Sequence, residues 1–207
     1  DPVRFMSNYS SGKMGYEVAI AAKTMGASVK LISGPVSLDT IKGVETQYVE
    51  TSNEMYEAVM SNAKDFDILI STAAIADYKP ANYSKTKYKK NQNNISIEFK
   101  RGIDIISTVS NKYKNIYTVG FAAETDSLKK NSLDKLTKKN LNMIVGNIAN
   151  HELKLGFESD YNEVTIFTKN KSLKIELSKK SEIAKKVLNV IADDYSSNIK
   201  LINKNAK

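Results

Sequence analysis

The chain has 207 residues, with 31 Lys and Arg against 23 Asp and Glu, which gives a formal net charge of +8 at pH 7. The absence of cysteine and the single histidine, His151, exclude disulfides, thiolate metal sites, cysteine nucleophiles and histidine-rich zinc sites. No apolar run approaches the roughly 18 residues of a membrane span, and residues 1–4 do not resemble a signal peptide, so a cytoplasmic protein without a membrane partner is expected.

Short strand-like runs alternate with helical stretches over the first 145 residues. The apolar periodicity predicts, in chain order, a helix at 16–25, strands at 27–33 and 44–49, a helix at 53–63, a strand at 67–71, a helix at 103–113, a strand at 117–122, a helix at 128–140 and a strand at 141–145. This alternation predicts an α/β fold, a Rossmann-like three-layer parallel sheet with helices on both faces. Because ligands bind beyond the carboxyl ends of such strands, the loops 72–79, 122–126 and 146–150 are expected to form one site.

Two later features depart from this alternation. A polar, lysine-dense stretch at about 80–94 is predicted to be a mobile flap. Residues 163–168 and 172–177 alternate apolar and polar side chains around a Lys-Asn-Lys turn, which predicts a C-terminal β-hairpin arm. An amphipathic helix is expected at about 180–194, and the polar tail 196–207 is expected to fray.

The segment Ser7–Gly15, Ser-Asn-Tyr-Ser-Ser-Gly-Lys-Met-Gly, carries small, polar and cationic residues where a helix begins. Helix N-termini present unpaired N–H groups and a partial positive charge. Ser10 and Ser11 could cap the helix or bond a ligand oxygen, Gly12 allows close backbone approach, and Lys13 adds a full charge. The turn therefore suits a phosphate or another anion, although a plain helix cap with a solvated lysine explains the same residues.

Polar residues also follow the predicted strands. Asp77 could contact a ribose hydroxyl or a magnesium ion, or cap a tight turn. Phe121 could stack on a base, and Glu124 could bind a metal or hold its loop. Lys135 and Lys139 share one helical face, where two ammonium groups are unfavourable unless an anion or an acidic partner lies between them. This pair could therefore point at phosphates or at solvent.

The flap carries four lysines between residues 85 and 90. A lysine on a mobile loop can close over a phosphate, but a solvated charge run is the commoner meaning of such a stretch. Tyr83 and Lys87 also have the Tyr-x-x-x-Lys spacing of short-chain dehydrogenases, which keeps an NAD(P)-dependent reductase as an alternative, although Pro80 disfavours the helix that the pair requires. A nucleic-acid-binding domain is the weakest alternative, because little base-stacking surface surrounds the lysines.

Taken together and in this order, five motifs resemble those of bacterial phosphopantothenate–cysteine ligase: SNYSSGKMG, AAIADY, KYKK, GFAAET and KxxxKN. The resemblance covers residue 1 to about 191 and implies a single CTP-binding ligase domain over 1–195. It implies that the carboxylate of 4′-phosphopantothenate attacks the α-phosphate of CTP, which gives an acyl-cytidylate and pyrophosphate. The amine of L-cysteine then displaces CMP. It further implies Mg²⁺ with CTP, a homodimer, and an upstream FMN-dependent decarboxylase domain, fused or separate.

The resemblance assigns catalytic roles to Asn8, which matches the asparagine that handles the acyl-cytidylate, and to Lys87, which matches the flap lysine of the first step. The matched CTP-binding positions are Ala73, Asp77, Lys87, Ile103, Asp104, Ile105, Ile106, Phe121, Lys135 and Lys139. The matched positions for phosphopantothenate or its phosphate are Arg4, Asn8, Ser10, Ser11, Gly12 and Ala74. Metal ligands are left unassigned.

The chain departs from the family pattern in three places. Tyr9 stands where many relatives carry histidine, and Gly102-Ile103-Asp104 replaces the usual Pro-Asp pair. Relatives carry a strand and a Gly-Gly-Thr turn before the Asp-Pro pair, so a first strand is expected to be missing from this chain. The hairpin over about 156–177 is the expected dimer interface. The reason is that an extended arm that buries little surface on its own domain can be exchanged with a partner.

Overall fold

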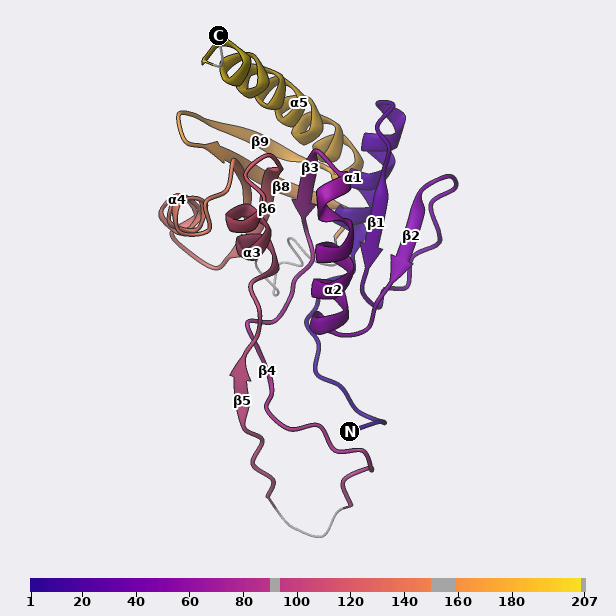
Figure 1. Ribbon diagram of the computed structural model, residues 1–207. Helices are drawn as coiled ribbons and strands as arrows, with labels where there is room; N and C mark the ends of the chain where they lie inside the picture. The colour runs from indigo at the N-terminus through magenta and orange to yellow at the C-terminus, as the bar shows by residue number, and fades with distance from the viewer. Residues whose placement is uncertain (90–93, 150–158, 206–207) are drawn as a thin grey trace.

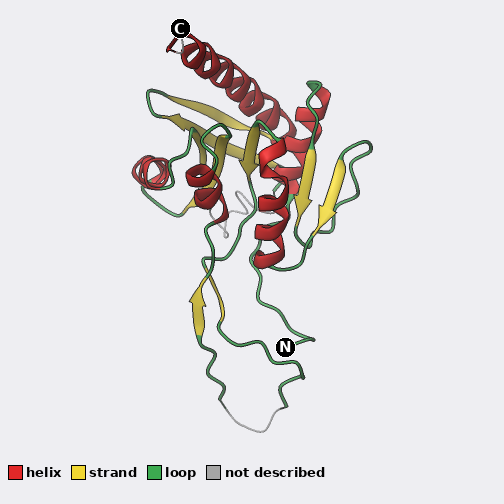
Figure 2. Cartoon of the chain, viewed as in Figure 1, coloured by secondary structure: helices red, strands yellow, loops and turns green. Residues whose placement is uncertain are grey.

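The computed structural model describes residues 1–89, 94–149 and 159–205 (Figures 1 and 2). Its elements are α1 (Lys13–Thr24), β1 (Lys30–Ser33), β2 (Glu45–Tyr48), α2 (Ser52–Asn62), the 3-10 turn η1 (Ala63–Asp65), β3 (Ile68–Ser71), β4 (Tyr78–Pro80), β5 (Phe99–Arg101), α3 (Ile105–Lys112), β6 (Tyr117–Glu124), α4 (Leu128–Lys138), β7 (Met143–Ile148), β8 (Tyr161–Thr168), β9 (Ser172–Lys179) and α5 (Lys180–Asn205). Every element expected from the apolar periodicity is present.

The main sheet has five strands in the order β3-β6-β7-β8-β9. Strands β3, β6 and β7 are parallel, whereas β8 and β9 are antiparallel to their neighbours. The predicted α/β fold is therefore confirmed, with a sheet that is mixed rather than wholly parallel. Strands β1 and β2 form a separate parallel pair, and no pairing joins β1 to β3 in the part of the chain that the structure describes. The expected first strand stays a prediction.

Helices cover both faces of the sheet. Successive strand residues point to opposite sides, so each face presents apolar side chains that a layer of helices buries. In β7, Met143 and Val145 join a core cluster with α1 and α5, while Ile144 joins a cluster with α3 and α4. Helices α2 and α3 build a third cluster around Met55 and Val109. Helix α1 also packs against α5. The three-layer arrangement holds the carboxyl ends of β3, β6 and β7 at one edge.

The β8–β9 hairpin is part of this core. It extends the sheet from β7, and its residues Val164 and Ile166 are only 1% exposed. The expectation that the hairpin buries little surface on its own domain is therefore wrong, because alternate β8 residues fill the cluster shared with α1 and α5. Its role in a dimer interface stays a prediction, and residues 156–158 of that interface lie outside the described residues.

The C-terminal helix is longer than the periodicity indicated. Helix α5 continues to Asn205, beyond the expected end at about residue 194, and the fraying of the tail from residue 196 stays a prediction. Two contacts hold this part of the helix: the Tyr195 ring packs edge-on against Tyr117 at 5.7 Å, and Asn198 Nδ2 donates to Asp194 Oδ2 at 3.1 Å. Both contacts lie at or beyond residue 194, where the expected amphipathic pattern ends.

The flap is closed at its base by the antiparallel β4–β5 ribbon, which the sequence did not indicate. Figure 1 shows the ribbon and flap projecting from the body on the side where the N-terminus lies, away from α5. The predicted flap over 80–94 thus has an ordered base, and residues 90–93 lie outside the described part.

Candidate functional site

The N-terminus of α1 lies beside the carboxyl end of β3. Gly12 is the N-cap residue, with φ of 77°, and the cap has no side-chain hydrogen bond. A Cβ atom on Gly12 would lie 2.6 Å from Val36 Cγ1, and one on Gly15 would lie 2.6 Å from Thr72 Oγ1. Glycine is therefore required for both the left-handed backbone and the close packing, and neither Ser10 nor Ser11 is the N-cap.

Asn8 connects this turn to the loop after β3. Its Nδ2 donates to the carbonyl oxygen of Ala74, and its Oδ1 accepts from the backbone N–H of Ser10 at 2.9 Å. The structure thus brings Asn8, Ser10 and Ala74 together, three residues that sequence reasoning placed in one substrate site. The Asn8 amide nitrogen carries two N–H donors, so a ligand can accept from one while Ala74 keeps the other.

Two cations surround a carboxylate at the same edge of the sheet. Lys13 Nζ lies 2.6 Å from Asp160 Oδ1, and the hydrogen bond from Lys13 lowers the pKa of Asp160. Lys180, the first residue of α5, is only 3% exposed. Burial is the main cause that lowers its pKa to about 8; Lys13 adds to the effect and Asp160 opposes it. Sequence reasoning missed Asp160 and Lys180, because no local motif indicates contacts so distant in sequence.

The helical lysines expected to bind CTP each hold a carboxylate. Lys135 Nζ lies 2.6 Å from Glu124 Oε1, and the Glu124 side chain is 11% exposed. Lys139 Nζ lies 2.9 Å from Asp104 Oδ2. Asp104 is also the N-cap of α3, where its Oδ1 accepts from Ser107 N at 3.1 Å. Each lysine is therefore paired with a carboxylate, which offsets the repulsion expected between the two ammonium groups. The ion pair with Lys135 also links Glu124, at the end of β6, to α4.

The apolar residues assigned to CTP lie in different surroundings. Ile105 and Ile106 are buried in the core, and Phe121 is half-buried against it. Ile103 is exposed. Any contact of Ile105 or Ile106 with a ligand would therefore use their backbone atoms, at the N-terminus of α3.

The flap contacts the N-terminal segment, four residues before Asn8. Arg4 Nη2 donates to the carbonyl oxygen of Tyr88 at 3.3 Å, and Asp1 Oδ2 accepts from the Tyr88 N–H at 3.3 Å. Lys87, the residue before Tyr88, is exposed. Asp77 accepts at its backbone oxygen from the N–H of Gly102 at 2.7 Å, which anchors the base of the ribbon. Arg4 and the flap segment that carries Lys87 are thus brought together.

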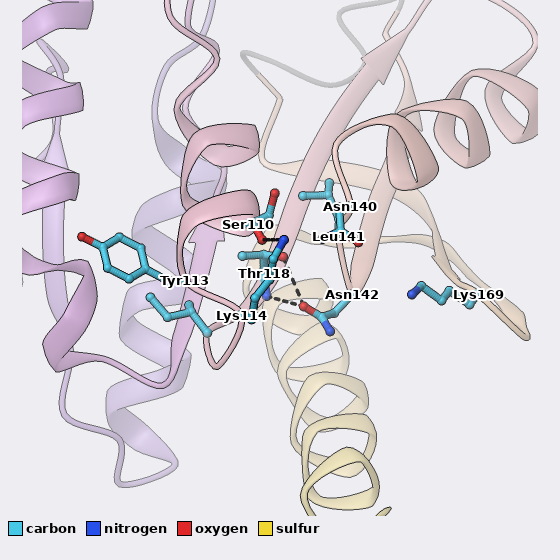
Figure 3. Close-up of a pocket in the computed structure, with 9 residues that line it drawn as sticks. Ser110, Tyr113, Lys114, Thr118, Asn140, Leu141, Asn142 and Lys169 are labelled. Atoms are coloured by element: carbon cyan, nitrogen blue, oxygen red, sulfur yellow. Dashed lines mark hydrogen bonds between the residues drawn. The ribbon is translucent and has the colours of Figure 1, made fainter. Parts of the chain in front are cut away.

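A cavity of about 160 Å³ lies at the opposite edge of the sheet (Figure 3). Asn142 Oδ1 accepts from Thr118 N at 2.8 Å, and Ser110 Oγ donates to the carbonyl oxygen of Lys139. These groups adjoin the amino ends of β6 and β7, so the cavity is separate from the site at their carboxyl ends. It is lined by Ser110, Tyr113, Lys114, Ile116, Thr118, Asn140, Leu141, Asn142 and Lys169.

Within residues 1–89, 94–149 and 159–205 there is no group of three or more His, Asp or Glu side chains that could hold a metal ion. Those residues also contain no helix long and apolar enough to cross a membrane. His151 lies outside the described residues.

Comparison with known proteins identifies the family. Residues 1–195 match the model of the DNA/pantothenate metabolism flavoprotein C-terminal domain. Relatives include the coenzyme A biosynthesis bifunctional proteins CoaBC of Vibrio parahaemolyticus, 44% identical over 91% of this chain and 48% of that protein, and of Bacillus subtilis, 43% identical over 93% and 48%.

A crystal structure of the C-terminal domain of a CoaBC protein is 38% identical, with a TM-score of 0.77 over 92% of this chain and 86% of that domain. The chain spans about half the length of the curated relatives it matches. These matches confirm the family resemblance drawn from the five motifs. The chain belongs to the DNA/pantothenate metabolism flavoprotein C-terminal domain family.

Proposed function

We propose that this chain is the ligase that joins 4′-phosphopantothenate to L-cysteine with CTP as co-substrate, releasing pyrophosphate and CMP. Two contacts of the N-terminal segment carry the proposal: Asn8 donates to Ala74 in the loop after β3, and Arg4 donates to Tyr88, the flap residue next to Lys87. By the motif resemblance, these positions correspond to substrate-binding and catalytic residues of the family. Relatives named for coenzyme A biosynthesis support the same assignment.

In the first step a carboxylate attacks a phosphate, so two anions must be brought together. This step needs positioning and neutralisation of charge more than an acid–base pair. Lys87 would reach the phosphates from the flap, while Lys135 and Lys139 would supply positive charge at the end of β6 and the start of α3. Their carboxylate partners fix where those charges lie. Backbone N–H groups at the N-termini of α1 and α3 offer further anion contacts.

In the second step the amine of cysteine attacks the acyl-cytidylate, and negative charge develops on the carbonyl oxygen. An amide donor placed at that oxygen stabilises the transition state. Asn8 Nδ2 has this role in the proposal. Because one N–H of this group donates to Ala74 O in the structure, the amide is already oriented, and its second N–H would donate to the intermediate.

The described residues do not fit a resident metal site, since they offer no cluster of three metal-ligating side chains. Mg²⁺ commonly binds through substrate phosphates with few protein ligands. It enters the proposal only as the counter-ion of CTP, and no step is assigned to it. A cytoplasmic homodimer, with an FMN-dependent decarboxylase domain upstream or on a separate chain, completes the proposal.

The test incubates the chain with CTP, 4′-phosphopantothenate and cysteine and measures the release of pyrophosphate and CMP. Lys87→Gln is expected to stop the first step. Asn8→Asp is expected to let acyl-cytidylate accumulate, because a carboxylate cannot donate to the oxyanion. Lys64→Gln, a change at an exposed lysine near the opposite edge, is the matched control and should keep parental turnover.

Two results would refute the proposal. One is the absence of CTP-dependent pyrophosphate release by the parent chain. The other is binding of NAD(P)H without binding of CTP, which would favour the reductase alternative. Parental turnover by Asn8→Asp would remove Asn8 from its role and leave the reaction class intact. Replacing CTP with ATP in the same assay measures the nucleotide preference.

A further inference from the structure

The carboxylate of Asp1 is almost completely buried, with its side chain 2% exposed, although the Arg4 side chain beside it is 58% exposed. Its Oδ1 accepts from the backbone N–H groups of Val3 and Arg4, each at 3.0 Å. Its Oδ2 accepts from Arg4 Nε at 3.0 Å and from Arg4 Nη2. The carboxylate therefore fixes the Arg4 backbone and guanidinium together.

The same ion pair also holds the flap. Asp1 Oδ2 accepts from the N–H of Tyr88, and Arg4 Nη2 donates to the carbonyl oxygen of Tyr88, both at 3.3 Å. Both backbone polar groups of one flap residue are thus bonded to the N-terminal segment, as they would be in a strand pairing. These contacts span more than 80 residues of sequence and end one residue after Lys87.

We propose that Asp1 is a positioning residue, whose carboxylate docks the flap through Tyr88 and so places Lys87 for the reaction. The inference rests on the proposed function, since it assumes that Lys87 acts on the nucleotide. Asp1 itself contacts no substrate in this proposal. It acts through the backbone of Tyr88 and the guanidinium of Arg4.

The chemistry requires a carboxylate at this position. Hydrogen bonds between ionised groups are stronger than neutral ones, and only a carboxylate accepts on both oxygens. An amide at this position could still accept from Val3 and Arg4 N–H. Its nitrogen would face the Arg4 guanidinium and the Tyr88 N–H, both of which are donors. Asp1→Asn therefore removes the bond from Tyr88 N–H to Asp1 and the ion pair that orients Arg4 toward Tyr88, while leaving the local turn in place.

The experiment combines limited trypsin digestion with turnover, using the whole chain. Trypsin cleaves after lysine, and the flap offers Lys85, Lys87 and Lys89. Asp1→Asn is expected to be cut in the flap about tenfold faster than the parent, with cleavage elsewhere unchanged. The maximal rate of CTP-dependent pyrophosphate release should fall about tenfold, with the KM for cysteine unchanged.

Matched variants separate docking from general damage. Asp1→Glu keeps the charge and should restore part of both properties, whereas Asp65→Asn, at an exposed aspartate near the opposite edge, should match the parent. Arg4→Gln removes the guanidinium instead and should also accelerate flap cleavage. Arg4→Gln provides a second test of docking if trypsin cleaves Asp1→Asn along its whole length, as it would an unfolded chain.

The outcomes distinguish this inference from the proposed function. Parental flap cleavage in Asp1→Asn overturns the docking, and fast flap cleavage with parental turnover overturns the positioning role. A parent without CTP-dependent turnover overturns the proposed function and the role assigned to Lys87, whatever the digestion shows.

Discussion

Replacing Lys180 by methionine tests whether burying this ammonium group at the start of α5 lowers the free energy of unfolding. Lys180 is 3% exposed, and burial together with nearby Lys13 lowers its pKa from 10.5 to about 8. At about 1.4 kcal/mol per pKa unit, this corresponds to about 3 kcal/mol of destabilisation at pH 7. Lys180→Met, similar in length and apolar, should therefore unfold with a larger free energy than the parent at pH 7.

The sign of the pH dependence provides the sharper measurement. Between pH 8 and 10.5 the unfolded chain keeps the Lys180 proton while the folded chain has released it, so the stability of the parent rises with pH through this window. Urea unfolding at pH 7, 8.5 and 10 should show the advantage of Lys180→Met shrinking by about 2 kcal/mol or more. Lys185→Met, at an exposed position of the same helix, should show no such trend. A constant difference between Lys180→Met and the parent over that range would refute the reasoning.

Three further variants test local packing and pairing by urea unfolding. Lys135→Met leaves the Glu124 carboxylate, 11% exposed, without its cation and should lower the free energy of unfolding by about 1–2 kcal/mol. Most of that loss should be regained in the double variant with Glu124→Gln. Equal stability of the single and double variants would contradict this expectation. Gly146→Ala would place a Cβ 2.6 Å from Ser132 Oγ and should cost about 1–3 kcal/mol, whereas a neutral result would mean that α4 can shift. Thr51→Ala removes the N-cap bond of α2 and should cost about 1 kcal/mol, and an unchanged midpoint would show that the cap is not stabilising.

The parallel half of the fold could be predicted because its signals are local. The apolar run at 67–71 and the apolar segment at 117–122 identified β3 and β6. The start of helix α2 is also capped locally, since Thr51 Oγ1 accepts from Glu54 N at 3.1 Å and Glu54 Oε2 accepts from Glu50 N at 2.9 Å. Each signal lies within a few residues of the element it defines.

Features that depend on distant contacts could not be predicted. Strands β4 and β5 have three residues each, and Pro80 lies in one of them, so their pairing has no pattern in sequence. The site shows the same limit. Motifs identified Asn8 and Lys135, but the partners that orient them, Ala74 and Glu124, follow only from the fold.

Lys135 and Lys13 differ in how firmly they are held, because their carboxylate partners differ in exposure. Glu124 is 11% exposed and also accepts from Asn131 Nδ2 at 3.2 Å, so releasing Lys135 would leave a buried charge poorly paired. Asp160 is 75% exposed, and water can replace Lys13 around it at little cost, since exposed ion pairs contribute about 0–1 kcal/mol. An arriving anion would therefore recruit Lys13 from Asp160 readily, while Lys135 stays fixed by Glu124. In the proposed function, the cation of the α1 turn is therefore exchangeable, whereas the charge at the end of β6 is set in advance.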